Sequence, residues 1–217
     1  YLLPLELQEK TVQTIVNADS TIQKLKEFEN LVIYEPSKAT QVTQDLQNLI
    51  VALEPLSEEE RLLNKIRNGE NHSTEFKSVL RKGAGEREMN SKLEHAVLKT
   101  ICGFLNTDGG VLFVGIEDNG NVIGINYSEF KSTDKFLLHF KNLIKGQIGA
   151  NHYPFINYKL TKLLDHEVLV VEVSKSDKPV YLGKDQNFYV RTNPATDELR
   201  GRELVEYIEN HFKELKN

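Results

Sequence analysis

Three acidic side chains, Glu70, Glu75 and Asp118, are spaced so that folding could bring them together. An amphipathic helix and an apolar strand lie between them, and elements of this length let the chain fold back on itself. Carboxylates held close together repel one another, which raises their pKa values unless a cation lies among them. Such oxygen ligands suit Mg²⁺ or Mn²⁺, and the ion can activate water and neutralise charge on a phosphate. The three acids are therefore candidate metal ligands and candidate catalytic residues.

The same three residues also have structural interpretations. Glu70 could be a solvated loop residue, and Glu75 could pair with Lys77. Asp118 begins Asp-Asn-Gly, which is typical of a hairpin turn whatever else it does. Residue types alone leave both interpretations open.

Basic residues close to the acids in the sequence are candidate contacts to a phosphate. In a strand over residues 74–80, Lys77 shares a face with Glu75, so it could meet a phosphate or an attacking water, or form an exposed ion pair. The glycine-bearing basic loop of residues 81–87 could follow a nucleic-acid backbone or be a solvated surface loop. Arg191, at the end of a predicted strand, could face phosphate or pair with an acid. The predicted nucleic-acid contacts are Lys77, Arg81, Lys82, Arg87, Lys99 and Arg191.

Two further residues could carry chemistry. His72 is the only histidine near the acids, and it could be a general acid or base or simply a surface residue. Cys102 is the only cysteine, which excludes an internal disulfide and a cysteine-rich zinc site. We expect Cys102 to be a buried packing residue on the apolar side of a helix, in a protein of a reducing compartment, the cytoplasm.

Hydrophobic periodicity predicts an α+β fold, a mixed β-sheet packed by helices, preceded by a small all-helical segment. Residues 1–55 are expected to be a helical connector or partner-binding segment, and residues 56–217 a single domain. A capping box at Ser57 and Glu60 begins the domain's first helix. The predicted helices lie within residues 5–31 and over 40–53, 57–69, 93–105, 133–148 and 201–215. The predicted strands are 74–80, 111–116, 122–124, 155–164, 167–173, 180–182 and 188–191, with a structural turn at 106–110 and a tight turn at Asp165 and His166.

Composition is that of a globular protein. The 217 residues carry a formal charge of −5, and residues 1–69 hold 7 basic and 11 acidic side chains, so the acidic excess belongs mostly to the amino-terminal third. Whole-chain charge argues neither for nor against nucleic acid, which a local patch would bind. The longest apolar runs are of strand length, so we expect a soluble protein without a membrane span.

Several separated motifs resemble the Schlafen AlbA-like domain. They are Gly69-Glu70 with Glu75-Phe76-Lys77, the continuous stretch from Lys99 to Gly120, Lys178 to Tyr181, and Phe188 to Thr192. The resemblance spans about residues 66–213 and leaves the first 55 residues uncovered.

The resemblance implies a function, because Schlafen proteins include metal-dependent endoribonucleases with a three-carboxylate site. Carried over by position, that site falls on Glu70, Glu75 and Asp118. It implies cleavage of structured, tRNA-like RNA with Mg²⁺ or Mn²⁺, Lys77 as phosphate contact, and a homodimer or higher oligomer. The resemblance also implies that the domain is the effector part of a larger protein, which would contain a sensor or ATPase domain. That larger protein would act in antiviral defence. The alternative is a catalytically inactive module that binds DNA or RNA, since fold alone does not establish catalysis. A third hypothesis is a protein-interaction domain that binds through the acidic amino-terminal helices.

Overall fold

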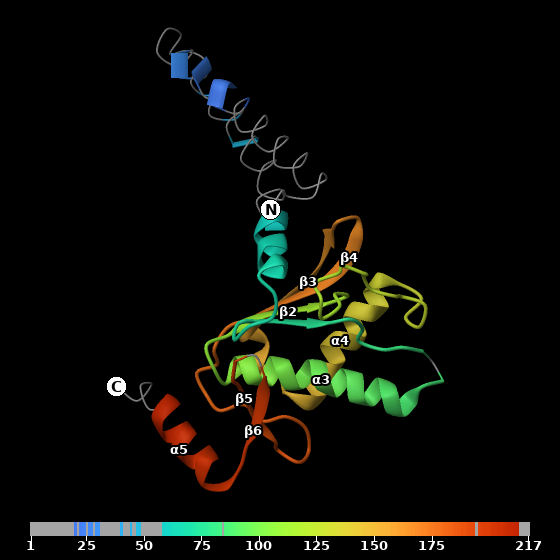
Figure 1. Cartoon of the computed structure of the whole chain (residues 1–217), viewed down its shortest axis with the longest axis vertical. Helices are drawn as coiled ribbons and strands as arrows, with labels where there is room; N and C mark the ends of the chain where they lie inside the picture. The colour runs from blue at the N-terminus through green and yellow to red at the C-terminus, as the bar shows by residue number, and fades with distance from the viewer. Residues whose placement is uncertain are drawn as a thin grey trace. The chain divides into compact units, whose positions relative to one another are not determined.

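The computed structural model describes residues 58–83, 85–193 and 195–212, together with short pieces at residues 20, 22–24, 26–27, 29–30, 40, 44 and 47–48. The chain divides into two compact units, Tyr1–Glu58 and Glu59–Asn217. Most of the helices expected before residue 54, and Ser57 of the capping box, lie outside the described residues. Figure 1 shows the second unit from its first helix in cyan to its last in red. In the described part of the chain, no helix combines the length and hydropathy that a membrane span requires.

The main sheet has four strands, in the order β1 (Thr74–Lys77), β2 (Gly110–Val114), β4 (His166–Val173) and β3 (Ile156–Leu163). β1 runs parallel to β2, whereas β4 is antiparallel to both β2 and β3. The expected α+β fold with a mixed sheet is therefore confirmed. β2 is buried along most of its length, as its nearly continuous apolar run predicts for a central strand.

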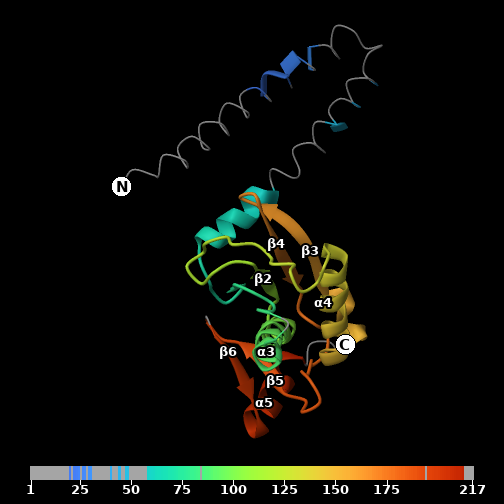
Figure 2. The same cartoon turned by 90° about the vertical axis from the view of Figure 1, so that its right-hand side faces the viewer.

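Helices cover both faces of this sheet. Because side chains alternate along a strand, Leu112 and Val114 of β2 face one layer, and Val111 and Phe113 face the other. The first layer contains α3 (Arg87–Leu105) and α4 (Thr133–Gln147), and the second contains the helix of residues 58–67. Figure 2 shows α4 beside β3 and the cyan helix on the opposite side of the sheet.

A second, two-stranded sheet packs on the other side of α3. It consists of β5 (Phe188–Arg191) and β6 (Thr196–Leu199), and α5 (Gly201–His211) follows it. Figure 2 shows α3 between the two sheets. β6 was not expected from the sequence, and the expected strand at 180–182 is only a single bridge between Leu182 and Asn187.

Other boundaries also differ from the sequence-based expectation. α3 begins at Arg87, six residues before its apolar stripe, because its first turns are exposed except at Asn90 and need no apolar side chains. A 3-10 helix over Ala150–Phe155, not expected, precedes β3. The tight turn between β3 and β4 lies at Leu164 and Asp165 rather than Asp165 and His166, since both residues have the positive φ values, 47° and 66°, of a two-residue hairpin loop.

Asn106, in the turn after α3, joins the second sheet and α5 to the helix. Its buried side chain donates from Nδ2 to the carbonyls of Val180 at 2.8 Å and Tyr189 at 2.9 Å, and its Oδ1 accepts from the Val180 amide at 2.8 Å. Its own carbonyl accepts from the Tyr207 hydroxyl of α5 at 2.7 Å. The turn is therefore structural, as expected.

We expect Asn106→Ala to lower the free energy of unfolding by about 3 to 5 kcal/mol, because each buried peptide group left without a partner costs about 1 to 3 kcal/mol. Urea unfolding should show a lower midpoint with an unchanged slope. The control is Asn142→Ala, at an exposed position of α4, which should change stability by less than about 0.5 kcal/mol. Equal stabilities of the two variants would refute this role for Asn106.

Candidate functional site

Glu75 is the candidate acid with the most contacts. On β1, Phe76 faces the helix of residues 58–67, so Glu75 and Lys77 face the α3 layer, as the alternation predicts. The Glu75 side chain is only 13% exposed. Its Oε2 accepts from Arg191 Nη1 at 2.8 Å, and its Oε1 accepts from Lys77 Nζ. Both oxygens are thus paired with cations of the same chain.

Arg191 is buried beside Glu75, with a side chain that is 1% exposed. Besides Glu75, its guanidinium donates to the Asn71 carbonyl at 2.6 Å, the Thr196 hydroxyl at 3.0 Å and, more weakly, the His72 carbonyl at 3.4 Å. Its Cζ lies 5.0 Å from the centre of the Phe104 ring. The guanidinium is enclosed by acceptors of its own chain, so in this conformation Arg191 has the pairing with an acid that the sequence also allowed, and its contact to phosphate stays a prediction.

Lys77 is the more accessible partner of Glu75. Its side chain is 26% exposed, and Nζ also donates to the Phe76 carbonyl at 2.8 Å. With two acceptors and partial exposure, Lys77 is held less firmly than Arg191. It is the one cation at Glu75 that a ligand could reach.

Glu70 lies beside β1 through an interaction of its own. After Gly69, which ends the first helix with a φ of 72°, the chain turns so that Glu70 Oε1 accepts from the Phe76 amide at 2.8 Å. β1 is an edge strand, and this amide points away from β2. The carboxylate thus satisfies an edge amide directly after Glu75 and leaves its second oxygen without a hydrogen bond to the described residues.

Asp118 lies in the turn that follows β2. It is exposed, in a turn closed by a hydrogen bond from the Gly120 amide to the Glu117 carbonyl at 2.8 Å. A side-chain carbon added to Gly120 would lie 3.6 Å from Ile66, so the turn packs against the first helix. This helix covers the sheet face opposite to the one that Glu75 occupies.

As arranged, the three acids do not fit a three-carboxylate site for Mg²⁺ or Mn²⁺. Among the described residues, no three histidine, cysteine, aspartate or glutamate side chains are grouped so that they could hold a metal ion. Glu75 is neutralised by two cations, and Arg191 cannot leave it without losing several buried hydrogen bonds. Glu75 and Lys77 lie on β1, Glu70 contacts that strand through the Phe76 amide, and Asp118 lies in a turn that packs against the helix of residues 58–67.

The other predicted nucleic-acid contacts separate into two groups. Arg81 is engaged, since its Nε lies 3.2 Å from Glu94 Oε1 and its Nη1 lies 3.5 Å from Glu129 Oε2. Lys99 places Nζ 5.3 Å from the centre of the Tyr189 ring. By contrast, Lys82 and Arg87 are exposed and have no ion pair within the described ranges.

Asn90 fixes the basic loop and was missed by the sequence analysis. Its buried side chain accepts from the Lys82 amide and donates to the Gly83 carbonyl, both at 2.8 Å. The only sequence signal was a polar residue on the inner face of α3. Lys82 is therefore presented from an anchored backbone.

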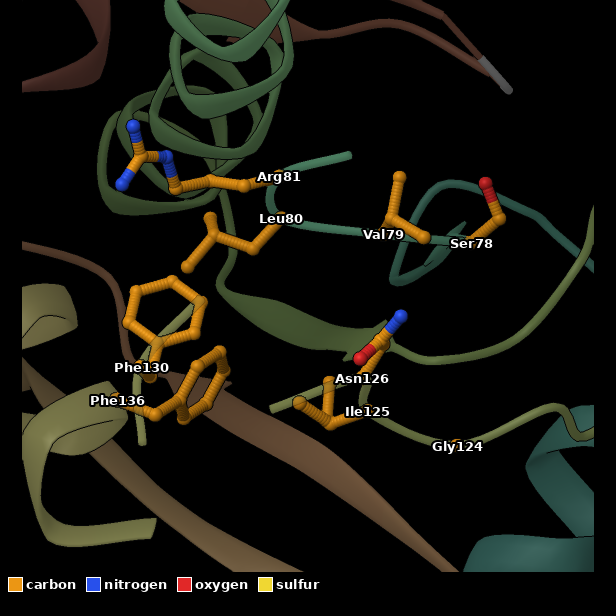
Figure 3. A pocket seen from close by; sticks show the side chains of 9 residues that line it. All are labelled: Ser78, Val79, Leu80, Arg81, Gly124, Ile125, Asn126, Phe130 and Phe136. Carbon is orange, nitrogen blue, oxygen red and sulfur yellow. The ribbon is translucent and has the colours of Figure 1, made fainter. Parts of the chain in front are cut away.

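A pocket near this loop is separate from the acids. It is lined by Ser78, Val79, Leu80, Arg81, Gly124, Ile125, Asn126, Phe130 and Phe136. Figure 3 shows the Arg81 guanidinium pointing away from Ile125 and Asn126, while Leu80 and Phe130 face each other. No titratable group points into the pocket in this view, so it offers no chemistry to the candidate site.

Cys102 is a packing residue and His72 lies at the surface. Cys102 is buried, its Sγ lies 3.3 Å from the Val180 carbonyl oxygen, and burial raises the pKa of its thiol to about 12, so it stays a protonated packing residue. His72 is exposed, and its carbonyl rather than its ring meets Arg191.

Comparison with known proteins gives one family and two structural likenesses. The family described as Schlafen, AlbA_2 matches residues 70–200. The DIP2311 protein from Corynebacterium diphtheriae is 20% identical with a TM-score of 0.47, over 64% of this chain but only 27% of that one. The N-terminal domain of a RecG-related protein from Nitrosomonas europaea is 18% identical with a TM-score of 0.42, over 67% of this chain and 94% of that one. Likenesses of this strength say nothing about function.

The family match covers the strand of Glu75, both core helices of the α3 layer, and the second sheet. It confirms the resemblance seen in the separated sequence motifs, and it supports a function connected with nucleic acids. Because the match spans more than half of the 217 residues, the chain belongs to the Schlafen AlbA_2 family.

Proposed function

We propose that this domain binds nucleic acid, with structured RNA as its preferred ligand. The observation that carries the proposal is the family match, and two exposed cations agree with it. Lys82 lies in the loop that Asn90 anchors, Arg87 is the first residue of α3, and no acid among the described residues pairs with either. Cations that neutralise phosphates release counterions from the nucleic-acid backbone, and a cation without an ion pair in its own chain breaks no interaction to do so.

Binding is favoured over catalysis by the state of Glu75. Its carboxylate is already the counter-ion of buried Arg191, so in this conformation it holds together the protein's own elements. A pocket prepared for a metal ion would instead leave carboxylate oxygens uncompensated and facing one another.

A metal-dependent endoribonuclease is the second candidate function. It is favoured by one observation, that Glu70 Oε1 reaches the amide next to Glu75 while Lys77 remains partly exposed on the same strand. Catalysis with Mg²⁺ or Mn²⁺ would require Asp118 to move toward these residues. A homodimer, a cytoplasmic setting, a defence role and a sensor or ATPase domain elsewhere in a longer chain remain proposals.

For the binding function, we expect the double variant Lys82→Glu, Arg87→Glu to bind a labelled RNA hairpin about tenfold more weakly at 0.1 M salt, because each lost phosphate contact removes a counterion-release term. Fluorescence anisotropy of the whole chain measures this. Lys162→Glu, Arg202→Glu is the matched control, since both cations are exposed but already paired with Asp165 and Glu206. Equal losses in the two variants would show that only total charge matters and would reject this binding surface.

For the nuclease candidate, Asp118→Asn is a cleaner probe than a Glu75 variant, because Asp118 is exposed and Glu75 is needed by Arg191. If the candidate holds, the wild type cleaves tRNA with Mg²⁺ or Mn²⁺ and not with chelator, while Asp118→Asn loses at least about a hundredfold in rate at unchanged stability. Asp185→Asn, at another exposed aspartate, should cleave normally. No cleavage by the wild type, or full activity of Asp118→Asn, rejects the nuclease.

A further inference from the structure

We propose that the outward face of α4 is a second phosphate-backbone contact, assigned to no role by the sequence motifs. The inference rests on the proposed binding of nucleic acid and adds a surface to it. The face consists of Lys131, just before the helix, and Lys135, Lys141 and Lys145 within it.

The pattern of burial along α4 defines this face. Phe136, Phe140 and Ile144 recur every four residues and are buried against the sheet, where the Phe140 and Tyr158 ring centres are 5.0 Å apart. The opposite side therefore faces outward, and Lys135 and Lys145 lie there, ten residues apart. At 1.5 Å per residue they are about 15 Å apart along the axis. One strand of a B-form duplex carries about four phosphates over that length.

Like Lys82 and Arg87, these lysines have no ion pair among the described residues, and they are gathered on one short stretch of the chain. Residues 131–147 contain four lysines and one acid, Asp134, whereas the whole chain has a net charge of −5. Within the described ranges none of the four lysines forms an ion pair, although Lys77, Arg81, Lys92 and Arg191 all do. The outward face of α4 is therefore a concentrated positive surface that the chain itself does not neutralise.

The chemistry of this face fits a nucleic acid better than a lipid surface. Leu138, 57% exposed, is the only large apolar side chain exposed on α4. A helix that lies in a membrane interface buries a whole apolar face, whereas the apolar face of α4 is already used by the core. One leucine among lysines offers a contact to a sugar or base beside the phosphates.

The helix is also attached to the basic loop. Glu94 of α3 bonds to His139 Nε2 of α4 at 2.7 Å and lies 3.2 Å from Arg81 Nε. α4 and the loop of Lys82 therefore belong to the same side of the sheet, held through one carboxylate. A single polynucleotide could meet both surfaces.

The test compares two triple variants of the whole chain for binding to a labelled RNA hairpin across a range of salt. Lys135→Gln, Lys141→Gln, Lys145→Gln should bind about 10- to 100-fold more weakly at 0.1 M salt, with a shallower salt slope, because three phosphate contacts are lost. Arg67→Gln, Lys162→Gln, Arg202→Gln removes the same charge at cations paired with Glu60, Asp165 and Glu206, and should lose less than about threefold. All six positions are exposed, so both proteins should fold, which circular dichroism verifies.

Each outcome decides between the claims. If the α4 variant keeps wild-type affinity and slope, the inference is overturned while the binding of nucleic acid stands. If the wild type binds no RNA or DNA hairpin, the proposed function fails and the inference fails with it. Binding of the wild type, but not of the α4 variant, to vesicles of anionic lipid, with neither hairpin bound, would assign the face to a membrane surface instead.

Discussion

The burial of the Arg191 guanidinium constrains the arrangement around the candidate site. A guanidinium cannot lose its proton and carries five N–H donors, so burying it is tolerable only where acceptors surround it. Here the acceptors come from three separate parts of the chain: the turn at residues 71 and 72, Glu75 on β1, and Thr196 on β6. Phe104 of α3 closes the remaining side. The Arg191 side chain, which comes from β5 of the second sheet, thus joins that sheet to the edge strand of the main sheet.

This constraint gives Glu75 its role. A carboxylate that compensates a buried arginine is held in one orientation, and its second oxygen is shared with the more accessible Lys77. Glu70 caps the edge of the same strand, and Asp118 belongs to a turn that packs against the helix of residues 58–67. The acidic residues of the family motif therefore serve the fold in this conformation, while Lys82, Arg87 and the lysines on the outward face of α4 carry the charge that suits a polyanion.

Much of the fold follows from local patterns in the sequence. The apolar stripe of α3, the continuous apolar run of β2 and the alternation of β1 each predict an element that the structure contains. β6 could not be predicted, because Thr196–Leu199 carries two acids and pairs with β5 through its backbone. The pairing of Arg191 with Glu75 joins residues 116 positions apart, and no local pattern reports such a contact. Likewise, the basic face of α4 becomes apparent only when each lysine is checked for a partner in space.

The central claim, that Glu75 is chiefly the counter-ion of Arg191, is tested most directly by a double-mutant cycle in urea unfolding. Glu75→Gln should lose about 3 to 5 kcal/mol, because it leaves a buried charge uncompensated. Adding Arg191→Met should restore part of that loss, so that the two changes are far from additive. A Glu75→Gln protein as stable as the wild type, or losses that simply add, would contradict the account.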